Sequence, residues 1–554
     1  MCAIHSINGP VIKIKGKTDL SMLELVYVGK KKLAGEVIAI DDQYTTIQIY
    51  ESATGLSPGE PVSGTGAPLT ATLGPGILSN IYDGIQRPLL DMAKTGGAFI
   101  ESGASASGSA FPLDLIKKYE VKLTCKQGDI LTGGDVYAEC PETPLIVHRC
   151  MLKPGSSGEI IWTAQDGKYA ADDVVAKIKD TNGRISELTL CQKWPIRSPR
   201  PVKKRMPPKR PLITGQRVID TLFPIAKGGT AAVPGGFGTG KTMIQHQIAK
   251  WCDADIIIYI GCGERGNEMT QVLEEFFKLK DPRTGSALTD RTVLIANTSN
   301  MPVAAREASI YTGVTLAEYY RDMGYHAAIM ADSTSRWAEA LREISGRLEE
   351  MPAEEGFPAY LPSRLAEFYE RAGYAVNLNG TEGSVTLIGA VSPQGADFSE
   401  PVTQNTKRFV RCFWALDKNL AYSRHYPAIN WITSYSDYLE DLSEYYEQNA
   451  GEDFLSLRSQ IMSILSEEAS LMEIVKLIGA DVLPDDQKLI IEIAKMIRTG
   501  FLQQNAFKKG EAFVVIEKQR QMMADILERY KQAKVHLSEG KPLSEFIKNN
   551  ESAP

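Results

Sequence analysis

The sequence PGGFGTGKT occupies residues 234–242 and decides how the middle of the chain folds. From its second residue onward it matches G-x-x-x-x-G-K-[ST], the pattern of the phosphate-binding loop. An apolar run precedes it at 230–233, and a helical pattern with Ile244 and Ile248 follows it. Glycines let backbone N–H groups turn towards a phosphate without Cβ clashes, and the helix points its positive end at the anion. We therefore predict a strand, a loop and a helix that bind nucleotide phosphates through Gly235, Gly236, Phe237, Gly238, Thr239, Gly240, Lys241 and Thr242.

The loop and the end of the next strand supply the chemistry that we expect. Lys241 would reach the β- and γ-phosphates, and Thr242 would ligate Mg²⁺. The apolar run at 255–260 predicts a buried parallel strand, and it leads into Glu264 and Arg265. Ligands of open α/β sheets lie beyond the carboxyl ends of the strands, so we expect Glu264 on the same rim as Lys241. There Glu264 can polarise a water for attack on the γ-phosphate, and Arg265 can neutralise charge on the group that is transferred. The alternative is a surface ion pair between these two residues.

A third strand is predicted at 325–332, where small and apolar residues end in Asp332. This is the Walker-B pattern, and Asp332 would hold Mg²⁺ through water, since this ion keeps much of its hydration shell. Any apolar strand can end in an aspartate, so the pattern is weak alone. The assignment becomes strong because three strand ends, those leading to the phosphate loop, Glu264 and Asp332, occur in the expected order.

Composition limits the classes of function. A chain of 554 residues is too long for one core, so several domains are expected. A net charge of −7 gives no electrostatic reason for nucleic acid or an anionic membrane as the main partner. No apolar run approaches the ~20 residues of a membrane span, and no signal peptide is evident. The eight cysteines form no C-x-x-C pair. We expect a cytoplasmic protein with reduced thiols that reaches a membrane only through partners.

Five strings carry a family resemblance: PGGFGTGKT at 234–242, GCGERGNEM at 261–269, ADSTSRWAEALREIS at 331–345, FPAYLPSRLAEFYERAG at 357–373 and FWALDKNLAYSRHYPAINW at 413–431. They resemble the catalytic A subunit of V-type and A-type rotary ATPases, and the resemblance extends over nearly the whole chain. It implies ATP hydrolysis or synthesis coupled to transport of H⁺ or Na⁺. The non-catalytic partner of this family lacks an intact phosphate loop, and the F-type β subunit lacks the long stretch before the loop. Thr239, where many eukaryotic relatives carry cysteine, favours a bacterial or archaeal source.

The resemblance also implies partners and an adenine site. B-type subunits would alternate with this chain in a hexameric ring and supply an arginine to the site. Central-stalk and peripheral-stalk subunits would connect the ring to a membrane sector, on the cytoplasmic face of a membrane. Tyr426 and Phe507 are the candidates for the apolar slot around adenine, with ordinary core packing as the alternative.

The predicted fold class is multidomain. A β-barrel comes first, then a β-rich bulge, an α/β phosphate-loop domain of RecA type and a helical bundle. Within the bulge we expect His148 and Asp135 at turns or on the surface, and just before the bulge, at 96–108, we expect a flexible loop. Prolines deny the chain regular ladders, so the Pro-rich basic linker should be an extended crossing between domains. Its charge could suggest a nucleic-acid patch, but no aromatic side chain is interleaved to stack on bases, so we expect a solvated linker. Ser470 fits a capping box, and Gly500 is placed to end a helix. The expected boundaries are barrel 1–70, connector 71–110, bulge 111–190, linker 191–211, nucleotide-binding domain 212–435 and helical domain 436–554.

Two other classes remain open. A homohexameric motor, such as a secretion ATPase or a Rho-like RNA translocase, shares the nucleotide-binding core but should lack the bulge. A non-hydrolysing assembly protein would bind nucleotide only, and the intact set of Lys241, Glu264 and Asp332 argues against it.

Overall fold

The structure is a computed structural model that describes residues 2–96, 103, 111–479, 482–508, 510–543 and 545–546. Most of the loop predicted at 96–108 lies outside these residues. The chain divides into two compact units, and each is described by itself. The first unit comprises Met1–Met206, Ala254–Val391 and Ser399–Phe409, and the second comprises Pro207–Asp253, Ser392–Phe398 and Val410–Pro554.

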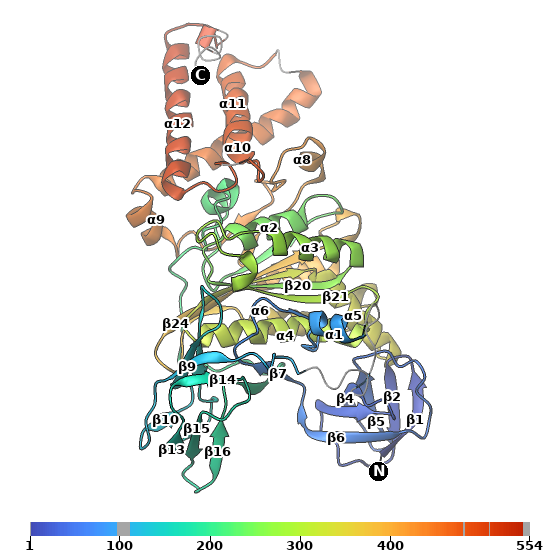
Figure 1. Ribbon diagram of the computed structural model, residues 1–554. Helices are drawn as coiled ribbons and strands as arrows, with labels where there is room; N and C mark the ends of the chain where they lie inside the picture. Colours follow the sequence, from blue (N-terminus) through green and yellow to red (C-terminus); the bar gives the residue numbers. More distant parts are fainter. Residues whose placement is uncertain are drawn as a thin grey trace. The chain divides into compact units, whose positions relative to one another are not determined.

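The first unit begins with a closed barrel of six strands, which confirms the predicted N-terminal domain (Figure 1). Its alternating sequences place one row of side chains inside, where Ile12, Val26, Val37 and Ile47 are fully buried. The strands follow the order β1 (Cys2–Asn8), β2 (Val11–Lys15), β5 (Tyr44–Ile49), β4 (Leu33–Ile40), β3 (Glu24–Val28) and β6 (Pro61–Pro68).

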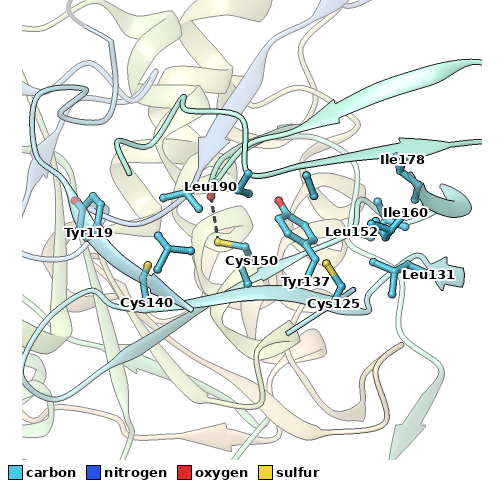
Figure 2. Packing of buried hydrophobic residues seen from close by; sticks show 14 residues of the cluster. Tyr119, Cys125, Leu131, Tyr137, Cys140, Cys150, Leu152, Ile160, Ile178 and Leu190 are labelled. Carbon is cyan, nitrogen blue, oxygen red and sulfur yellow. Dashed lines mark hydrogen bonds between the residues drawn. The ribbon is translucent and has the colours of Figure 1, made fainter. Parts of the chain in front are cut away.

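Two four-stranded sheets form the predicted β-rich bulge. Buried residues including Tyr137, Cys150, Leu152 and Ile160 make its core, and Cys150 Sγ donates a hydrogen bond to the Leu190 carbonyl at 3.6 Å (Figure 2). One sheet has the order β10 (Ile130–Thr132), β13 (Ser157–Thr163), β15 (Ala176–Lys179) and β16 (Ile185–Leu188). The other has the order β12 (Val147–Met151), β11 (Val136–Pro141), β9 (Tyr119–Leu123) and β14 (Gly167–Tyr169).

His148 differs from its prediction, because it is fully buried instead of lying at the surface. It lies on β12, where its Nδ1 is 2.9 Å from Glu142 Oε2 and its Nε2 is 2.9 Å from the Tyr319 hydroxyl. Tyr319 belongs to helix α4 (Val303–Asp322), so the prediction failed because the strand packs against a helix distant in sequence. Asp135 does close a turn, accepting a hydrogen bond from the Thr132 N–H at 2.7 Å.

Glu142 is the centre of this buried cluster. Its carboxylate accepts hydrogen bonds from the backbone N–H groups of Gly76 and Leu78 and from the Tyr320 hydroxyl on α4. Burial opposes ionisation of Glu142, but the hydrogen bond and charge of His148 and the two backbone N–H groups outweigh it and hold the pKa below its usual value. One side chain therefore joins the bulge, the segment at 76–78 and α4.

The predicted solvated linker is wrong for two of its arginines. Arg197 forms ion pairs with Glu36 of the barrel (2.9 Å) and Glu307 of α4 (2.8 Å). Arg200 is 3% exposed and pairs with Asp322 at 2.6 Å. Buried carboxylates on α4 draw these arginines inside, because a buried charge needs a partner. The segment also forms short strands: β17 (Gln192–Pro195) pairs with β7 (Thr70–Leu73), and β18 (Lys204–Met206) pairs with β23 (Gly373–Val376).

A parallel sheet completes the first unit. Its strands are buried on both faces and therefore read as near-continuous apolar runs. Gly313 of α4 packs against Ile260 on one face, and Met269 of α3 (Gly266–Lys278) packs against Gly261 on the other. α5 (Thr334–Arg347), α6 (Leu361–Tyr369) and α7 (Pro401–Phe409) also belong to this unit. The strand order is β24 (Glu382–Val391), β22 (His326–Asp332), β20 (Ile256–Glu264), β21 (Thr292–Thr298) and β8 (Ile81–Tyr82).

The second unit contains β19 (Thr230–Pro234), the loop that follows it and α2 (Lys241–Trp251). β19 pairs in parallel with β25 (Cys412–Phe413), which pairs antiparallel with β26 (Tyr435–Ser436). The C-terminal part is helical, as predicted, with α8 (Lys418–Tyr422), α9 (Ser443–Asn449), α10 (Phe454–Ile478), α11 (Asp485–Met496) and α12 (Ile516–Ser538). None of the helices described is both long and apolar enough to cross a membrane.

Two helix-end predictions in this unit are wrong. Ser470 lies inside α10 and donates to the carbonyl of Ser466 at 3.4 Å instead of capping a new helix. Gly500 lies within a π-helical continuation of α11, Ile497–Leu502, so the helix does not end there. In both places the buried face of the helix continues past the local signal for a helix start (Ser470) or a helix end (Gly500).

Replacing Glu142 with glutamine tests the buried cluster. The amide cannot accept hydrogen bonds from His148, Tyr320 and the two backbone N–H groups together, so the free energy of unfolding should fall by about 3 kcal/mol as buried donors lose their partner. The pKa of Glu142 is lowered from 4.5, so its contribution is present above pH 4.5 and is lost as the pH falls through the lower folded value. The glutamine variant has no carboxyl group to protonate at this position, so its free energy of unfolding should not show this decrease at low pH. Urea unfolding across pH measures both effects.

The matched control is Glu139→Gln on the preceding strand. Glu139 pairs with Arg149 at 3.2 Å, and its side chain is 37% exposed, so its loss should cost at most ~1 kcal/mol. Equal effects of the two substitutions would contradict the special role of Glu142.

Candidate active site

The phosphate-binding loop of the second unit has the backbone that its glycines predict. Gly238 and Gly240 have φ of 76° and 93°, the left-handed region that disfavours side chains. Gly240 caps α2, which begins at Lys241, so the loop leads directly into the positive end of a helix. This geometry suits an anion such as a phosphate.

Side chains hold the loop in this shape. Lys241 Nζ donates to the carbonyls of Gly235 (2.8 Å) and Gly236 (2.9 Å), and the buried Thr239 hydroxyl donates to Gly236 O at 2.8 Å. The lysine ammonium is thus retained over the loop, where an anionic ligand can replace the carbonyls as its partner. Thr242 lies in the first turn of α2, and Phe237, at the tip of the loop, is 84% exposed.

Lys418 is a neighbour of the loop that the sequence did not indicate. A Cβ built on Gly236 would lie 2.6 Å from Lys418 Cε, so the lysine side chain packs closely on the backbone of the loop. Lys418 Nζ donates to the carbonyl of Gly395 at 3.1 Å. The motif could not reveal this residue, because it follows β25, far along the chain from the loop.

The two candidate adenine residues lie in the same unit and are both exposed. Tyr426 is 43% exposed, and its ring would lie 3.7 Å from a Cβ built on Gly240. Phe507 is 82% exposed, and its N–H donates to Asn505 Oδ1. The Tyr426 carbonyl accepts a hydrogen bond from the Gln504 N–H at 2.8 Å, which ties the two segments together. Such exposure is incompatible with core packing for Phe507.

In the first unit, Glu264 ends β20 at an irregular turn. Gly263 has φ of 73°, and the register with β21 shifts between Cys262 and Glu264. Burial first, and then the negative charge of Asp332, raise the pKa of Glu264 to about 7, against opposing contributions from Arg336 and Ser333. A carboxylate with a pKa near neutrality suits a general base.

This raised pKa argues against a stable surface pair between Glu264 and Arg265, which would lower it. Arg265 instead lies 3.7 Å from Glu268, and its side chain is 66% exposed. The exposed guanidinium can therefore turn towards an anionic ligand at little cost.

Asp332 ends β22 and is 3% exposed. The Tyr259 hydroxyl donates to its Oδ2 at 3.1 Å. Among the residues described, no group of three or more His, Cys, Asp or Glu side chains gathers to hold a metal ion. Asp332 and Thr242 each offer oxygen, the ligand type of Mg²⁺, which takes few protein ligands and completes its shell with water and substrate phosphates.

Arg336 and Arg306 were missed by the sequence reasoning. A Cβ on Gly263 would lie 2.6 Å from Arg336 Cβ and 3.1 Å from Arg306 Cδ, so both arginines pack on the turn that carries Glu264. Arg336 follows Asp332 by four residues at the start of α5, and that spacing was the available signal.

Comparison with known proteins gives four family matches along the chain. These are the beta-barrel domain of the ATP synthase alpha/beta family at 4–66, the barrel-sandwich domain at 110–197, the nucleotide-binding domain at 215–436 and the C-terminal domain of V and A type ATP synthase at 443–547.

Individual relatives agree with these matches. The V-type ATP synthase alpha chain of Halothermothrix orenii is 60% identical, over 98% of this chain and 92% of its own. The A subunit of the A-type ATP synthase of Methanopyrus kandleri is 56% identical over the same shares. Among solved structures, the ATPase EscN of an enteropathogenic E. coli type III secretion system has a TM-score of 0.66 at 20% identity, covering 95% of this chain and all of its own. That likeness shows a shared fold alone.

Replacing Lys241 with alanine tests the loop as the phosphate site. Loss of its ammonium should weaken binding of ATP at least ~100-fold, because a charged hydrogen-bond donor to the polyphosphate disappears. Calorimetric titration of the purified chain measures this. Lys250→Ala, at the other end of α2, removes the same charge outside the loop and should bind ATP normally. Unchanged affinity of the Lys241 variant would exclude the loop as the site.

Proposed function

Since the chain belongs to the family of V-type ATP synthase alpha chains and A-type ATP synthase A subunits, we propose that it is the catalytic subunit of a rotary ATPase. It hydrolyses or synthesises ATP and couples this reaction to transport of H⁺ or Na⁺. The observation that carries the proposal is an intact phosphate loop, with Lys241 held over it, in a chain 60% identical to a V-type alpha chain. The homohexameric secretion motor has weaker support, because EscN is only 20% identical.

The loop and the two exposed rings bind the nucleotide. Lys241 and the loop N–H groups hold the β- and γ-phosphates, and the positive end of α2 favours their charge. Tyr426 and Phe507 present faces on which adenine can stack. Remote binding of adenine and phosphates keeps the γ-phosphate in place for reaction.

Glu264 and Arg265 act on the γ-phosphate. With a pKa of about 7, Glu264 takes a proton from the attacking water and orients it. Arg265 stabilises the charge that spreads over the transferring oxygens. Thr242 and Asp332 would hold Mg²⁺, which neutralises phosphate charge when bound.

The remaining part of the proposal concerns assembly. B-type subunits occupy every second position beside this chain in a hexameric ring, and an arginine from the B-type neighbour completes the site. Central-stalk and peripheral-stalk subunits connect the ring to the membrane sector, so the chain acts at the cytoplasmic face of a membrane without entering it. Family membership supports this assembly, and the net charge of −7 gives no electrostatic reason for nucleic acid as a partner.

Glu264→Gln tests the general base. The amide keeps size and hydrogen-bonding reach but cannot accept the proton, so ATP should still bind while hydrolysis falls at least ~100-fold. The rate of the unmodified enzyme should fall as the pH drops below about 7, because Glu264 becomes protonated there. The residual rate of the variant should not show this decrease. Steady-state ATPase assays of the assembled complex from pH 5.5 to 9 measure both. Glu274→Gln, on the exposed side of α3, is the control, and a near-normal rate for Glu264→Gln would disprove the assignment.

The shared site predicts a slow isolated chain. An arginine donated by a neighbouring protein is typically worth about 10³–10⁵ in rate. The purified chain should therefore bind Mg·ATP but turn it over very slowly, and adding the B-type partner should restore the rate. Steady-state hydrolysis per site, compared between the monomer and the reconstituted ring, measures this. Equal rates would mean that the site is complete within one chain.

A further inference from the structure

Tyr259 is a polar residue in the middle of an aliphatic strand. β20 reads IIIYIGCGE, and the tyrosine is 1% exposed. Its ring lies against Phe276 of α3, with centroids 5.6 Å apart and planes at 53°. Its hydroxyl donates to Asp332 Oδ2 at 3.1 Å. A phenylalanine would pack equally well here, so packing does not account for the hydroxyl.

The strand register explains how the hydroxyl reaches the carboxylate. β20 and β22 are parallel neighbours, with Gly261 opposite Asp332 and Tyr259 opposite Met330. Residues two apart on a strand share a face, so the tyrosine lies on the face from which Gly261 would project. Gly261 has no side chain, and a Cβ there would overlap Met269 Cε. The phenol and Asp332 therefore lie together on the face covered by α3.

This contact is a buried hydrogen bond. A phenol hydroxyl is protonated at neutral pH, so it can donate, and this one lies in the core within hydrogen-bond distance of the carboxylate. A carboxylate that is 3% exposed is costly without donors. The bond fixes one of its two oxygens and, through it, the plane of the group.

We propose that Tyr259 is a positioning residue, whose hydroxyl orients the Asp332 carboxylate for the magnesium ion of the bound nucleotide. This inference rests on the proposed function, since it takes Asp332 as a Mg²⁺ residue. Partners that hold the ligands of a metal typically matter about 10- to 100-fold in its affinity. We expect an effect at the lower end of this range of affinity changes, because Asp332 acts on the ion through water.

The experiment uses the full chain with Tyr259→Phe, which keeps the ring against Phe276 and removes only the hydroxyl. Mn²⁺ replaces Mg²⁺ as the probe, and electron paramagnetic resonance measures its affinity at saturating ADP. We expect a loss of about tenfold in Mn²⁺ affinity. Affinity for ADP in EDTA should not change, because Lys241 and the loop are intact.

Tyr311→Phe is the matched control. Tyr311 is 3% exposed, and among the residues described its hydroxyl has no hydrogen-bond partner. This substitution should leave Mn²⁺ affinity unchanged. A purely structural effect of losing a buried hydroxyl would instead change thermal stability in both variants and Mn²⁺ affinity in neither.

The outcomes separate the inference from the proposed function. If the unmodified chain shows no Mn²⁺-dependent ADP binding, the proposed function fails. If it does and Tyr259→Phe binds Mn²⁺ equally well, only the inference on Tyr259 is overturned. If Tyr259→Phe lacks the native circular dichroism spectrum, Phe276→Leu decides, because it keeps an apolar contact but frees the tyrosine ring. Unchanged Mn²⁺ affinity in that variant would overturn the inference.

Discussion

Helix α4 is buried along nearly its whole length although it carries several charges, and the first unit is organised around this constraint. An unpaired carboxylate in such a place costs several kcal/mol, so each one needs a cation. Glu307 pairs with Arg197, Glu318 with Arg371 and Asp322 with Arg200. These cations come from other segments, so the ion pairs that the carboxylates of α4 require also bring those segments against the helix.

The same pairs determine how the parts of this unit are joined. Arg197 also binds Glu36, which connects the barrel to α4, and Glu142 connects the bulge to Tyr320 on the same helix. At its N-terminal end, the backbone carbonyl of Arg306 accepts a hydrogen bond from Cys262 Sγ, and its guanidinium donates to Ser299 O at 2.8 Å. The helix that holds the barrel and the bulge therefore also holds the turn that carries Glu264.

The parts that the sequence predicted are those set by local rules. The phosphate loop needs glycines at fixed spacing, and a parallel strand buried on both faces is apolar throughout, so the loop, β20 and β22 could be recognised. The fold class and the family followed from these strings. The roles of Lys241, Glu264 and the other site residues remain predictions.

What the sequence could not predict depends on contacts between distant segments. His148 and Arg200 are polar residues that look solvated locally, and only the carboxylates facing them explain their burial. Ser470 and Gly500 carry local helix signals that buried faces of α10 and α11 override. Tyr259 reads as one more core aromatic until the register places Asp332 beside its hydroxyl.

Asp332 and Glu264 end neighbouring strands, yet their surroundings differ in the way that their two proposed roles require. Asp332 is the more deeply buried, and it receives a hydrogen bond from the Tyr259 hydroxyl, which fixes the orientation of its carboxylate. Burial and the negative charge of Asp332 oppose ionisation of Glu264, so its pKa rises to about 7. A base must exchange protons near the working pH, whereas a group that holds a cation must keep its charge. Separating two nearby carboxylates by their environments is how a protein assigns such roles. Here the Tyr259 hydroxyl orients one carboxylate, while burial beside that carboxylate raises the pKa of the other.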